Sequence, residues 1–115
     1  AGDQRLINLI REATDSESIW IFDCRNRSSA IGNMANTTKL TGGSEWGYAA
    51  CNIEYCGLPN IHKVKGYFDK LQSHDFGPWL ETCRLMLQNA LQIARVLQEE
   101  SQCVLIHCTD GWDRT

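Results

Sequence analysis

The sequence contains no long hydrophobic run and no surplus of positive charge. Each apolar stretch is well short of the roughly 20 residues that a helix needs to cross a bilayer. The opening residues, AGDQRLINLI, lack the layout of a signal peptide. A formal net charge of −3 leaves no basic excess for neutralising many phosphates, which argues against general nucleic-acid binding. A small local basic pocket is still compatible with this balance.

The sequence also lacks internal repeats and low-complexity tracts, and its length suits a single domain. A chain of 115 residues can bury one modest core but not two. Its 43% hydrophobic and 22% charged residues are ordinary for a globular protein. The chain starts at Ala1, not Met, and stops at Thr115 within a sequence motif. We therefore expect residues 1–115 to be a partial domain cut from a longer protein.

Cysteine is well represented, and its pattern favours reduced thiols. An even number of cysteines would suit a disulfide scaffold in a short secreted chain, but three of them sit within apolar strand or helix patterns. We interpret most of them as reduced core residues of a cytosolic protein. A zinc site from Cys51, Cys56 and His62 is an alternative, although it lacks a second close pair of ligands. The six cysteines are Cys24, Cys51, Cys56, Cys83, Cys103 and Cys108.

Hydrophobic periodicity predicts an α/β fold. Compact apolar runs predict strands over residues 18–24, 51–58 and 103–107, and residues 25–47 form a polar stretch with a turn at Gly42 and Gly43. Strands separated by helices imply crossover connections, and therefore a largely parallel sheet flanked by helices. Apolar residues at helical spacing predict helices over residues 4–13 and 78–98. A further helix is expected over residues 61–72, after Asn60, and a brief one within residues 30–35.

Two polar residues stand at the expected helix starts. Asn60 precedes the helix over residues 61–72 and is a plausible N-cap. Asp75 stands shortly before the helix that opens at Pro78, and we expect its side chain to cap that helix.

The last residues combine a cysteine and an arginine at a spacing with chemical meaning. Cys108 and Arg114 are separated by five residues, and this spacing alone is a weak signal. Its context is stronger, because the pair directly follows a predicted strand and His107, and encloses Gly111. A loop that leaves the carboxyl end of a parallel strand and leads into a helix points its N–H groups into one concavity. Such a concavity binds a phosphate dianion.

The same loop would activate the cysteine. Converging N–H groups stabilise a thiolate, so we expect a lowered pKa and a nucleophilic Cys108. Gly111 permits a tight turn, and Arg114 offers a planar fork to two phosphate oxygens. Attack by the thiolate gives a phosphocysteine that water hydrolyses. We expect His107 to orient the loop by hydrogen bonding.

Other readings of Cys108 are weaker. It would be a buried strand-end cysteine only if the whole motif were a coincidence. A redox disulfide with Cys103 is excluded, because five strand steps separate the two α-carbons by about 16 Å.

Residues 107–115, HCTDGWDRT, closely resemble the signature of the myotubularin family, in which serine usually follows the cysteine. The chain departs from the family pattern at Thr109 and at Asn26, where proline is usual, and Thr41 interrupts the usual glycine run. The resemblance extends upstream to residues 22–35 (FDCRNRSSAIGNMA), Gly42-Gly43, Asn60-Ile61-His62 and Trp79-Leu80-Glu81.

The resemblance implies removal of the 3-phosphate from phosphatidylinositol 3-phosphate and phosphatidylinositol 3,5-bisphosphate, without a cofactor or metal. It assigns Cys108 as nucleophile, Arg114 as phosphate ligand and Asp113 as general acid. Each of three residues also has a competing structural interpretation. Asn60 would be a helix cap, Asn33 a turn residue, and Trp112 a packing residue. The substrate-binding residues that it implies are Asn33, Asn60, Thr109, Asp110, Gly111 and Trp112.

The same resemblance implies a phosphoinositide headgroup as partner and a cytoplasmic protein peripherally associated with endosomal membranes. Homo- or hetero-oligomers would form through segments outside this chain. A protein tyrosine phosphatase is a second reading, in which Asp75 is the rival general acid, but the D-G-W-D interior argues against it. A non-catalytic, pseudophosphatase-like binding module is a third, disfavoured because Cys108 and Arg114 are both present.

Overall fold

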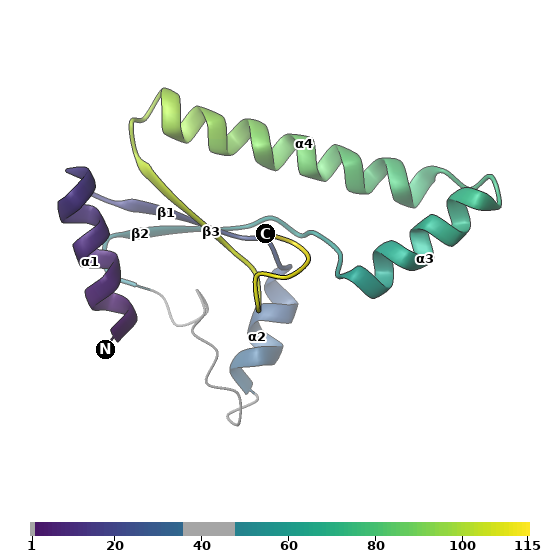
Figure 1. Ribbon diagram of the computed structural model, residues 1–115, viewed down its shortest axis with the longest axis horizontal. Coiled ribbons are helices and arrows are strands. Elements are labelled where there is room, and N and C mark those ends of the chain that lie inside the picture. Colours follow the sequence, from purple (N-terminus) through teal and green to yellow (C-terminus); the bar gives the residue numbers. More distant parts are fainter. Residues whose placement is uncertain (1, 36–47) are drawn as a thin grey trace.

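The computed structural model of the chain describes residues 2–35 and 48–115 and has an α/β fold (Figure 1). The predicted turn at Gly42 and Gly43 lies outside the described residues. The strands are separated by helices, as the sequence predicts. The helices are α1 (Gly2–Thr14), α2 (Arg27–Ala35), α3 (Ile61–Gln72) and α4 (Gly77–Gln98). The strands are β1 (Ile19–Asp23), β2 (Cys51–Tyr55) and β3 (Cys103–His107).

The three strands form one parallel sheet in the order β2-β1-β3, which confirms the predicted fold class. The central strand β1 is buried on both faces, and this explains its continuous apolar run in place of an alternating pattern. In the register of the sheet, Asp23 at the end of β1 pairs with Tyr55 of β2 and His107 of β3. All three strands therefore end in one row, and the loops that follow share one edge of the sheet.

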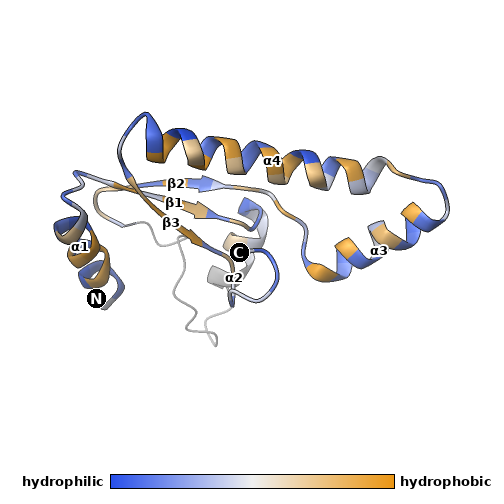
Figure 2. Cartoon of the chain, turned by 45° about the horizontal axis from the view of Figure 1, so that its top comes forward, coloured by the Kyte–Doolittle hydropathy of each residue, from blue (hydrophilic) through white to orange (hydrophobic). Residues whose placement is uncertain are grey.

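Helices cover both faces of this sheet. On one face, Ile7 of α1 belongs to a buried cluster with Ile21 of β1. Successive strand residues point to opposite faces, and on the other face Phe22 clusters with Val96 of α4. The hydrophobic residues of α4 recur along the helix (Figure 2), as the spacing in the sequence predicts.

Strand β2 ends three residues earlier than the sequence pattern suggests. The prediction extended it to Leu58, whereas the structure ends it at Tyr55. Gly57 has φ of +69°, and its N–H donates to the carbonyl of Arg25 at 3.2 Å. The chain thus leaves the sheet through a left-handed glycine that apolar content alone did not indicate.

The start of α4 also differs from the prediction. The residue at its N-cap is Phe76, and no side chain makes a capping hydrogen bond there. Asp75 is therefore not the cap of α4, and that expectation was wrong. The helix begins with Gly77, and Pro78 in the first turn suits a position whose N–H has no partner within the helix.

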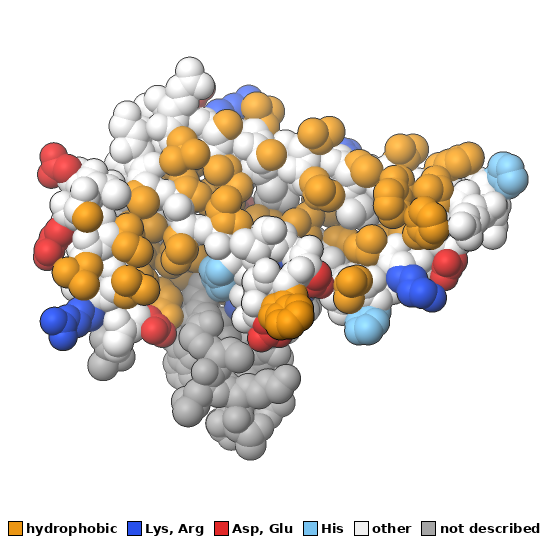
Figure 3. All heavy atoms as spheres, in the orientation of Figure 1, with side chains coloured by type: hydrophobic (Ala, Val, Ile, Leu, Met, Phe, Trp, Pro, Cys, Tyr) orange, Lys and Arg blue, Asp and Glu red, His pale blue; other side chains and the backbone are white. Residues whose placement is uncertain are grey.

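Several large hydrophobic side chains are exposed, and Figure 3 shows hydrophobic side chains spread over α1, β3 and α4. Leu80 and Leu87 of α4 are 61% and 72% exposed, and Ile106 of β3 is 41% exposed. Within residues 2–35 and 48–115, no helix combines the length and the apolar character needed to span a membrane.

The cysteines are all free thiols, three of them buried. Among the described residues, no three His, Cys, Asp or Glu side chains gather closely enough to hold a metal ion. Cys51, Cys56 and His62 therefore do not form the zinc site considered from the sequence.

Candidate active site

The loop after β3 wraps around the sulfur of Cys108. Residues 108–115, here called the Cys108 loop, leave the carboxyl end of β3 and curl back on themselves (Figure 1). The backbone N–H of Gly111 donates a hydrogen bond to Cys108 Sγ at 3.1 Å. The other groups that hydrogen-bond to this sulfur are the backbone N–H groups of Asp110 and Arg114 and the side chain of Thr115.

These hydrogen bonds make Cys108 acidic. Burial of the thiol, which is 3% exposed, works to raise its pKa. The hydrogen bonds from the Thr115 side chain and from three backbone N–H groups oppose burial and lower the pKa of Cys108 from 9.0 to about 7. A substantial fraction of this cysteine is therefore thiolate at neutral pH, as the loop pattern in the sequence predicts.

Gly111 makes the tight turn of the loop possible. Its φ is +72°, in the left-handed region that side chains with a Cβ rarely adopt. A Cβ added to this glycine would meet no atom within 4 Å. The glycine is therefore required by the backbone conformation of the loop and not by lack of space around it.

Arg114 lies at the far end of the loop with one donor unsatisfied. Its Nη2 donates to Thr109 Oγ1 at 3.2 Å, and its Nε lies 3.8 Å from Asp113 Oδ1. That Nε is buried and makes no hydrogen bond. A buried unsatisfied N–H is costly, and an anion oxygen in the loop would satisfy it.

Asp113 connects the loop to the start of α3. Its Oδ2 accepts a hydrogen bond from the backbone N–H of Ile61 at 3.1 Å. Asn60 accepts from the N–H of Lys63 at 3.0 Å, so the predicted N-cap of α3 is confirmed. The structure thus brings Asn60 beside Asp113, although the two are far apart in the sequence.

A buried ion pair that was not predicted as part of the site lies under the loop. Asp23 and Arg25 are 0% and 1% exposed, and the guanidinium donates to both carboxylate oxygens at 2.9 and 2.6 Å. His107 Nε2 lies 3.7 Å from Asp23 Oδ2. The signal available in the sequence was a charged residue at the end of a buried strand, Asp23, and a second just after it, Arg25, because parallel sheets place their sites at the carboxyl ends of strands.

His107 links this ion pair to the loop. Its Nδ1 lies 2.9 Å from the carbonyl oxygen of Cys108. Because a carbonyl oxygen only accepts hydrogen bonds, Nδ1 carries the proton and donates it. The prediction that His107 orients the loop by hydrogen bonding is therefore confirmed.

Asp75, the rival acid considered from the sequence, lies far from the Cys108 loop. Asp113 contacts the first residue of α3, whereas Asp75 follows the last turn of that helix. Since α3 has 12 residues and a helix rises 1.5 Å per residue, its ends are about 18 Å apart. Figure 1 shows the turn between α3 and α4 at the end of α3 remote from the loop.

The remaining predicted substrate residues differ in where the structure places them. Thr109 contacts Arg114, and Asp110 contributes its N–H to the Cys108 sulfur. Trp112 is 91% exposed, so it does not pack into the protein. Asn33 falls within α2, but its side chain lies outside the described part of the structure.

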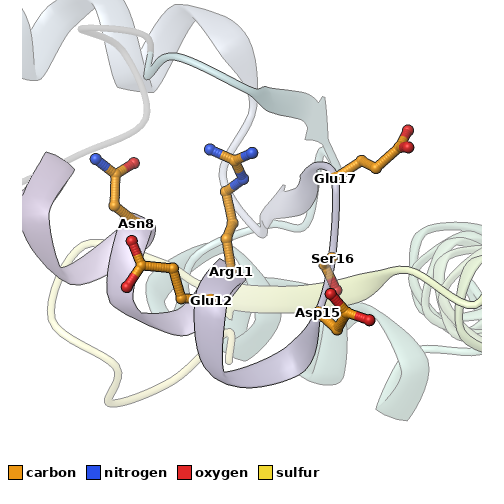
Figure 4. A pocket seen from close by; sticks show the side chains of 6 residues that line it. All are labelled: Asn8, Arg11, Glu12, Asp15, Ser16 and Glu17. Carbon is orange, nitrogen blue, oxygen red and sulfur yellow. The ribbon is translucent and has the colours of Figure 1, made fainter.

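Two cavities differ in their relation to the loop. One of about 340 Å³ lies between α3, α4 and the loop, where Asp113 and Arg114 line it together with apolar side chains such as Trp79 and Met86. The other, of about 350 Å³, is formed by α1 and the turn before β1, and no residue of the Cys108 loop lines it. Figure 4 shows its lining residues, Asn8, Arg11, Glu12, Asp15, Ser16 and Glu17.

The chain is similar in sequence to a known family and to several known proteins. A family model described as "Myotubularin-like phosphatase domain" matches residues 1–115. A phosphatidylinositol-3,5-bisphosphate 3-phosphatase of Caenorhabditis elegans is 35% identical, over 90% of this chain and 11% of the relative. Myotubularin of Xenopus laevis is 31% identical, over 98% of this chain and 21% of the relative. A phosphatidylinositol-3-phosphate phosphatase of Mus musculus is 28% identical, over 98% and 19%. The chain therefore spans a small part of the length of these relatives.

Proposed function

Because this chain belongs to the myotubularin-like phosphatase domain family, we propose that it forms part of the catalytic domain of a phosphoinositide 3-phosphatase. Relatives named for phosphatidylinositol 3-phosphate and phosphatidylinositol 3,5-bisphosphate make these lipids the expected substrates. The observation that carries the proposal is the acidic thiol of Cys108, held by converging donors at the end of a parallel strand.

The first step is attack of the Cys108 thiolate on the phosphorus of the 3-phosphate. A sulfur–phosphorus bond forms while the bond from phosphorus to the inositol oxygen breaks. The loop N–H groups that now face the sulfur would hold the non-bridging phosphate oxygens, where negative charge gathers. The unsatisfied Nε of Arg114 supports its role as a further ligand of these oxygens.

Asp113 is the proposed general acid of this step. It donates its proton to the leaving inositol oxygen, so that the lipid departs as a neutral alcohol. The hydrogen bond from Ile61 N–H to Asp113 supports this role, because it fixes the carboxyl group without any closing motion of a distant loop.

Hydrolysis of the phosphocysteine completes the cycle. Water attacks the phosphorus, the sulfur–phosphorus bond breaks, and Cys108 leaves as thiolate. Asp113, now a carboxylate, accepts the proton of that water. Inorganic phosphate then leaves the loop, and the donors return to the sulfur.

Residues near the loop are proposed to contact the rest of the lipid headgroup and the membrane. Asn60 stands beside Asp113, and its place supports a contact with the inositol ring in addition to its capping role. Asp110 and Asn33 are proposed to contact the headgroup as well. The exposed Trp112 has the amphipathic ring that favours membrane interfaces, and it supports peripheral binding to a cytoplasmic membrane surface, which we propose to be endosomal.

The proposal is tested by phosphate release from short-chain phosphatidylinositol 3-phosphate and phosphatidylinositol 3,5-bisphosphate, with a phosphotyrosine peptide measured in parallel. The protein is assayed with any segments that flank these residues. We expect release from the lipids and little from the peptide. Cys108→Ser should abolish release because the loop does not ionise a serine hydroxyl, whereas Cys103→Ser, at the start of β3, should retain it.

Two results would overturn the proposal. Preference for the phosphotyrosine peptide would make the protein a tyrosine phosphatase. Absence of release from every substrate, with the protein folded, would make it a non-catalytic binding module.

A further inference from the structure

Three cysteines lie side by side at the carboxyl edge of the sheet. Cys24, Cys56 and Cys108 each directly follow a strand, and Asp23, the residue before Cys24, pairs in the sheet register with the residues before the other two. The ladders continue by one residue, because Cys24 N–H donates to His107 O and Cys56 N–H to Asp23 O, both at 2.8 Å. The strand order β2-β1-β3 therefore places Cys24 between the other two cysteines.

This spacing suits a disulfide between Cys24 and Cys108. Neighbouring strands lie about 4.8 Å apart, and disulfides join α-carbons that are about 4.4–6.8 Å apart. Cys56 is two strands away from Cys108, so its separation of about 9.6 Å is too large for a bridge. All three side chains are buried, with exposures of 4% for Cys24, 5% for Cys56 and 3% for Cys108.

We propose that Cys24 is a modification site: when a peroxide oxidises Cys108, Cys24 forms a reversible intramolecular disulfide with it. The Cys108 thiolate first attacks hydrogen peroxide, giving Cys108 sulfenic acid and hydroxide. The Cys24 sulfur then attacks the sulfenic sulfur; the sulfur–oxygen bond breaks and hydroxide leaves. The two thiol protons convert both hydroxides to water, and the two electrons reduce the peroxide.

The thiol of Cys56 supports the role of Cys24 as the attacking group. A hydrogen bond from Cys56 lowers the pKa of Cys24, although burial and the nearby Cys108 and Asp23 act to raise it. The same hydrogen bond, with burial, raises the pKa of Cys56. Of this hydrogen-bonded pair, Cys24 is the one that follows the strand next to β3, and it is therefore the thiol placed to attack Cys108.

The consequence is protection of the nucleophile. Sulfenic acid that meets no thiol proceeds to sulfinic and sulfonic acids, which thiol reductants do not reverse. A disulfide with Cys24 stops this progression and leaves a form that dithiothreitol returns to the active thiolate. This inference rests on the proposed function in one respect, because it requires the Cys108 thiolate. It does not require that the protein hydrolyses a phosphoinositide.

The test is peptide mapping after mild treatment with hydrogen peroxide. Cleavage after Arg and Lys releases Cys24 within residues 12–25 and Cys108, together with Cys103, within residues 96–114, and fragmentation of the joined peptides distinguishes Cys108 from Cys103. In the wild-type protein we expect these two peptides to be joined, with loss of phosphatase activity that dithiothreitol restores. In Cys24→Ser, no such link forms, Cys108 is found as sulfinic or sulfonic acid, and the loss of activity becomes irreversible. Cys56→Ser is the matched control and keeps the link.

Each outcome decides between the two proposals. If iodoacetamide fails to alkylate Cys108 at neutral pH in the reduced protein, the thiolate of the proposed function is wrong and this inference with it. If Cys108 is alkylated but peroxide joins residues 12–25 to 40–63, through Cys56 or Cys51, or forms no link, the inference alone is overturned. Equal recovery of Cys24→Ser and wild type by dithiothreitol would overturn it too.

Discussion

At the scale of single residues, the chemistry of this chain depends on which groups face the Cys108 sulfur. Burial by itself would make this thiol a weaker acid, and only the four converging hydrogen bonds reverse that effect. His107 holds the carbonyl of the same residue, and Asp23 and Arg25 lie beneath it. The nucleophile is therefore positioned from the strand below as well as from the loop around it.

The general acid is tested by Asp113→Asn compared with Asp75→Asn. A general acid must be protonated to act, so activity falls as the pH rises through its pKa. Asparagine cannot donate that proton, and we expect turnover to fall about 100-fold or more, with loss of the alkaline limb of the pH–rate profile. An asparagine oxygen can still accept from Ile61 N–H, so the contact between the loop and the start of α3 should remain.

Asp75→Asn is the matched control for this prediction. Because Asp75 neither caps α4 nor reaches the loop, turnover and its pH dependence should stay as in the wild type. The reverse pattern, with the pH dependence lost in Asp75→Asn, would point to a tyrosine-phosphatase mechanism.

The buried ion pair is tested by Asp23→Asn. This change removes the negative charge and leaves Arg25 buried beside a neutral amide. Removing one partner of a buried pair costs about 3–5 kcal/mol, and we expect a loss of this size in the free energy of unfolding, measured by urea denaturation. Glu81→Gln breaks an ion pair whose side chains are both about half exposed, and it should leave the unfolding curve unchanged. Equal effects of the two changes would show that burial does not matter here.

At the scale of helices and strands, local patterns in the sequence predicted most of the fold but not its long-range consequences. Apolar periodicity identified α1, α3, α4 and the three strands, because that spacing follows directly from helix and strand geometry. The end of β2 was missed, because the left-handed conformation of Gly57 depends on its hydrogen bond to Arg25, far away in the sequence.

In the candidate site too, local features were predictable and long-range ones were not. The Cys108 loop was predictable because its residues are contiguous and their chemistry is specific. The contribution of Asp23 and Arg25 was not, because only the sheet order β2-β1-β3 brings the end of β1 beside the end of β3. The remoteness of Asp75 likewise follows from the direction of α3, which spacing along the chain does not give.

The turn in the loop is tested by two glycines with the same backbone conformation. Gly111 and Gly57 have φ of +72° and +69°, and a Cβ would meet no atom at either. Replacing either by alanine should cost roughly 1–2 kcal/mol of stability, because the left-handed conformation is strained for alanine. Only Gly111→Ala should disturb the donors around Cys108, and so raise its pKa above about 7.

The pH dependence of alkylation by iodoacetamide measures that difference. The rate follows the thiolate fraction, so a raised pKa moves its half-point to higher pH. We expect such a shift for Gly111→Ala and none for Gly57→Ala. An unshifted curve for Gly111→Ala would mean that the loop donors do not acidify Cys108.

At the scale of the whole molecule, the chain combines a buried nucleophile with many exposed apolar side chains. Large hydrophobic side chains on α3, α4 and β3 are exposed, among them Phe68, Leu91 and Leu105. Folding that leaves so much apolar surface in water gains less from the hydrophobic effect than a fully covered core would.

Residues 1–115 on their own are therefore expected to be marginally stable and to have negligible phosphatase activity. The exposed apolar surface should bind the dye ANS and promote association in size-exclusion chromatography. A protein of the chain's 13.0 kDa that elutes as a monomer, unfolds cooperatively and hydrolyses phosphatidylinositol 3-phosphate well would contradict this expectation.

The central claim, that Cys108 becomes covalently phosphorylated during turnover, is tested most directly by trapping the intermediate. The protein, with any flanking segments, is mixed with phosphatidylinositol 3-phosphate, quenched within the first turnover and cleaved after Arg and Lys. We expect mass spectrometry to find one phosphoryl group on the peptide 96–114, assigned by fragmentation to Cys108 and absent from Cys108→Ser. Phosphate release without any phosphoryl group on Cys108, at times when turnover is under way, would contradict the covalent mechanism.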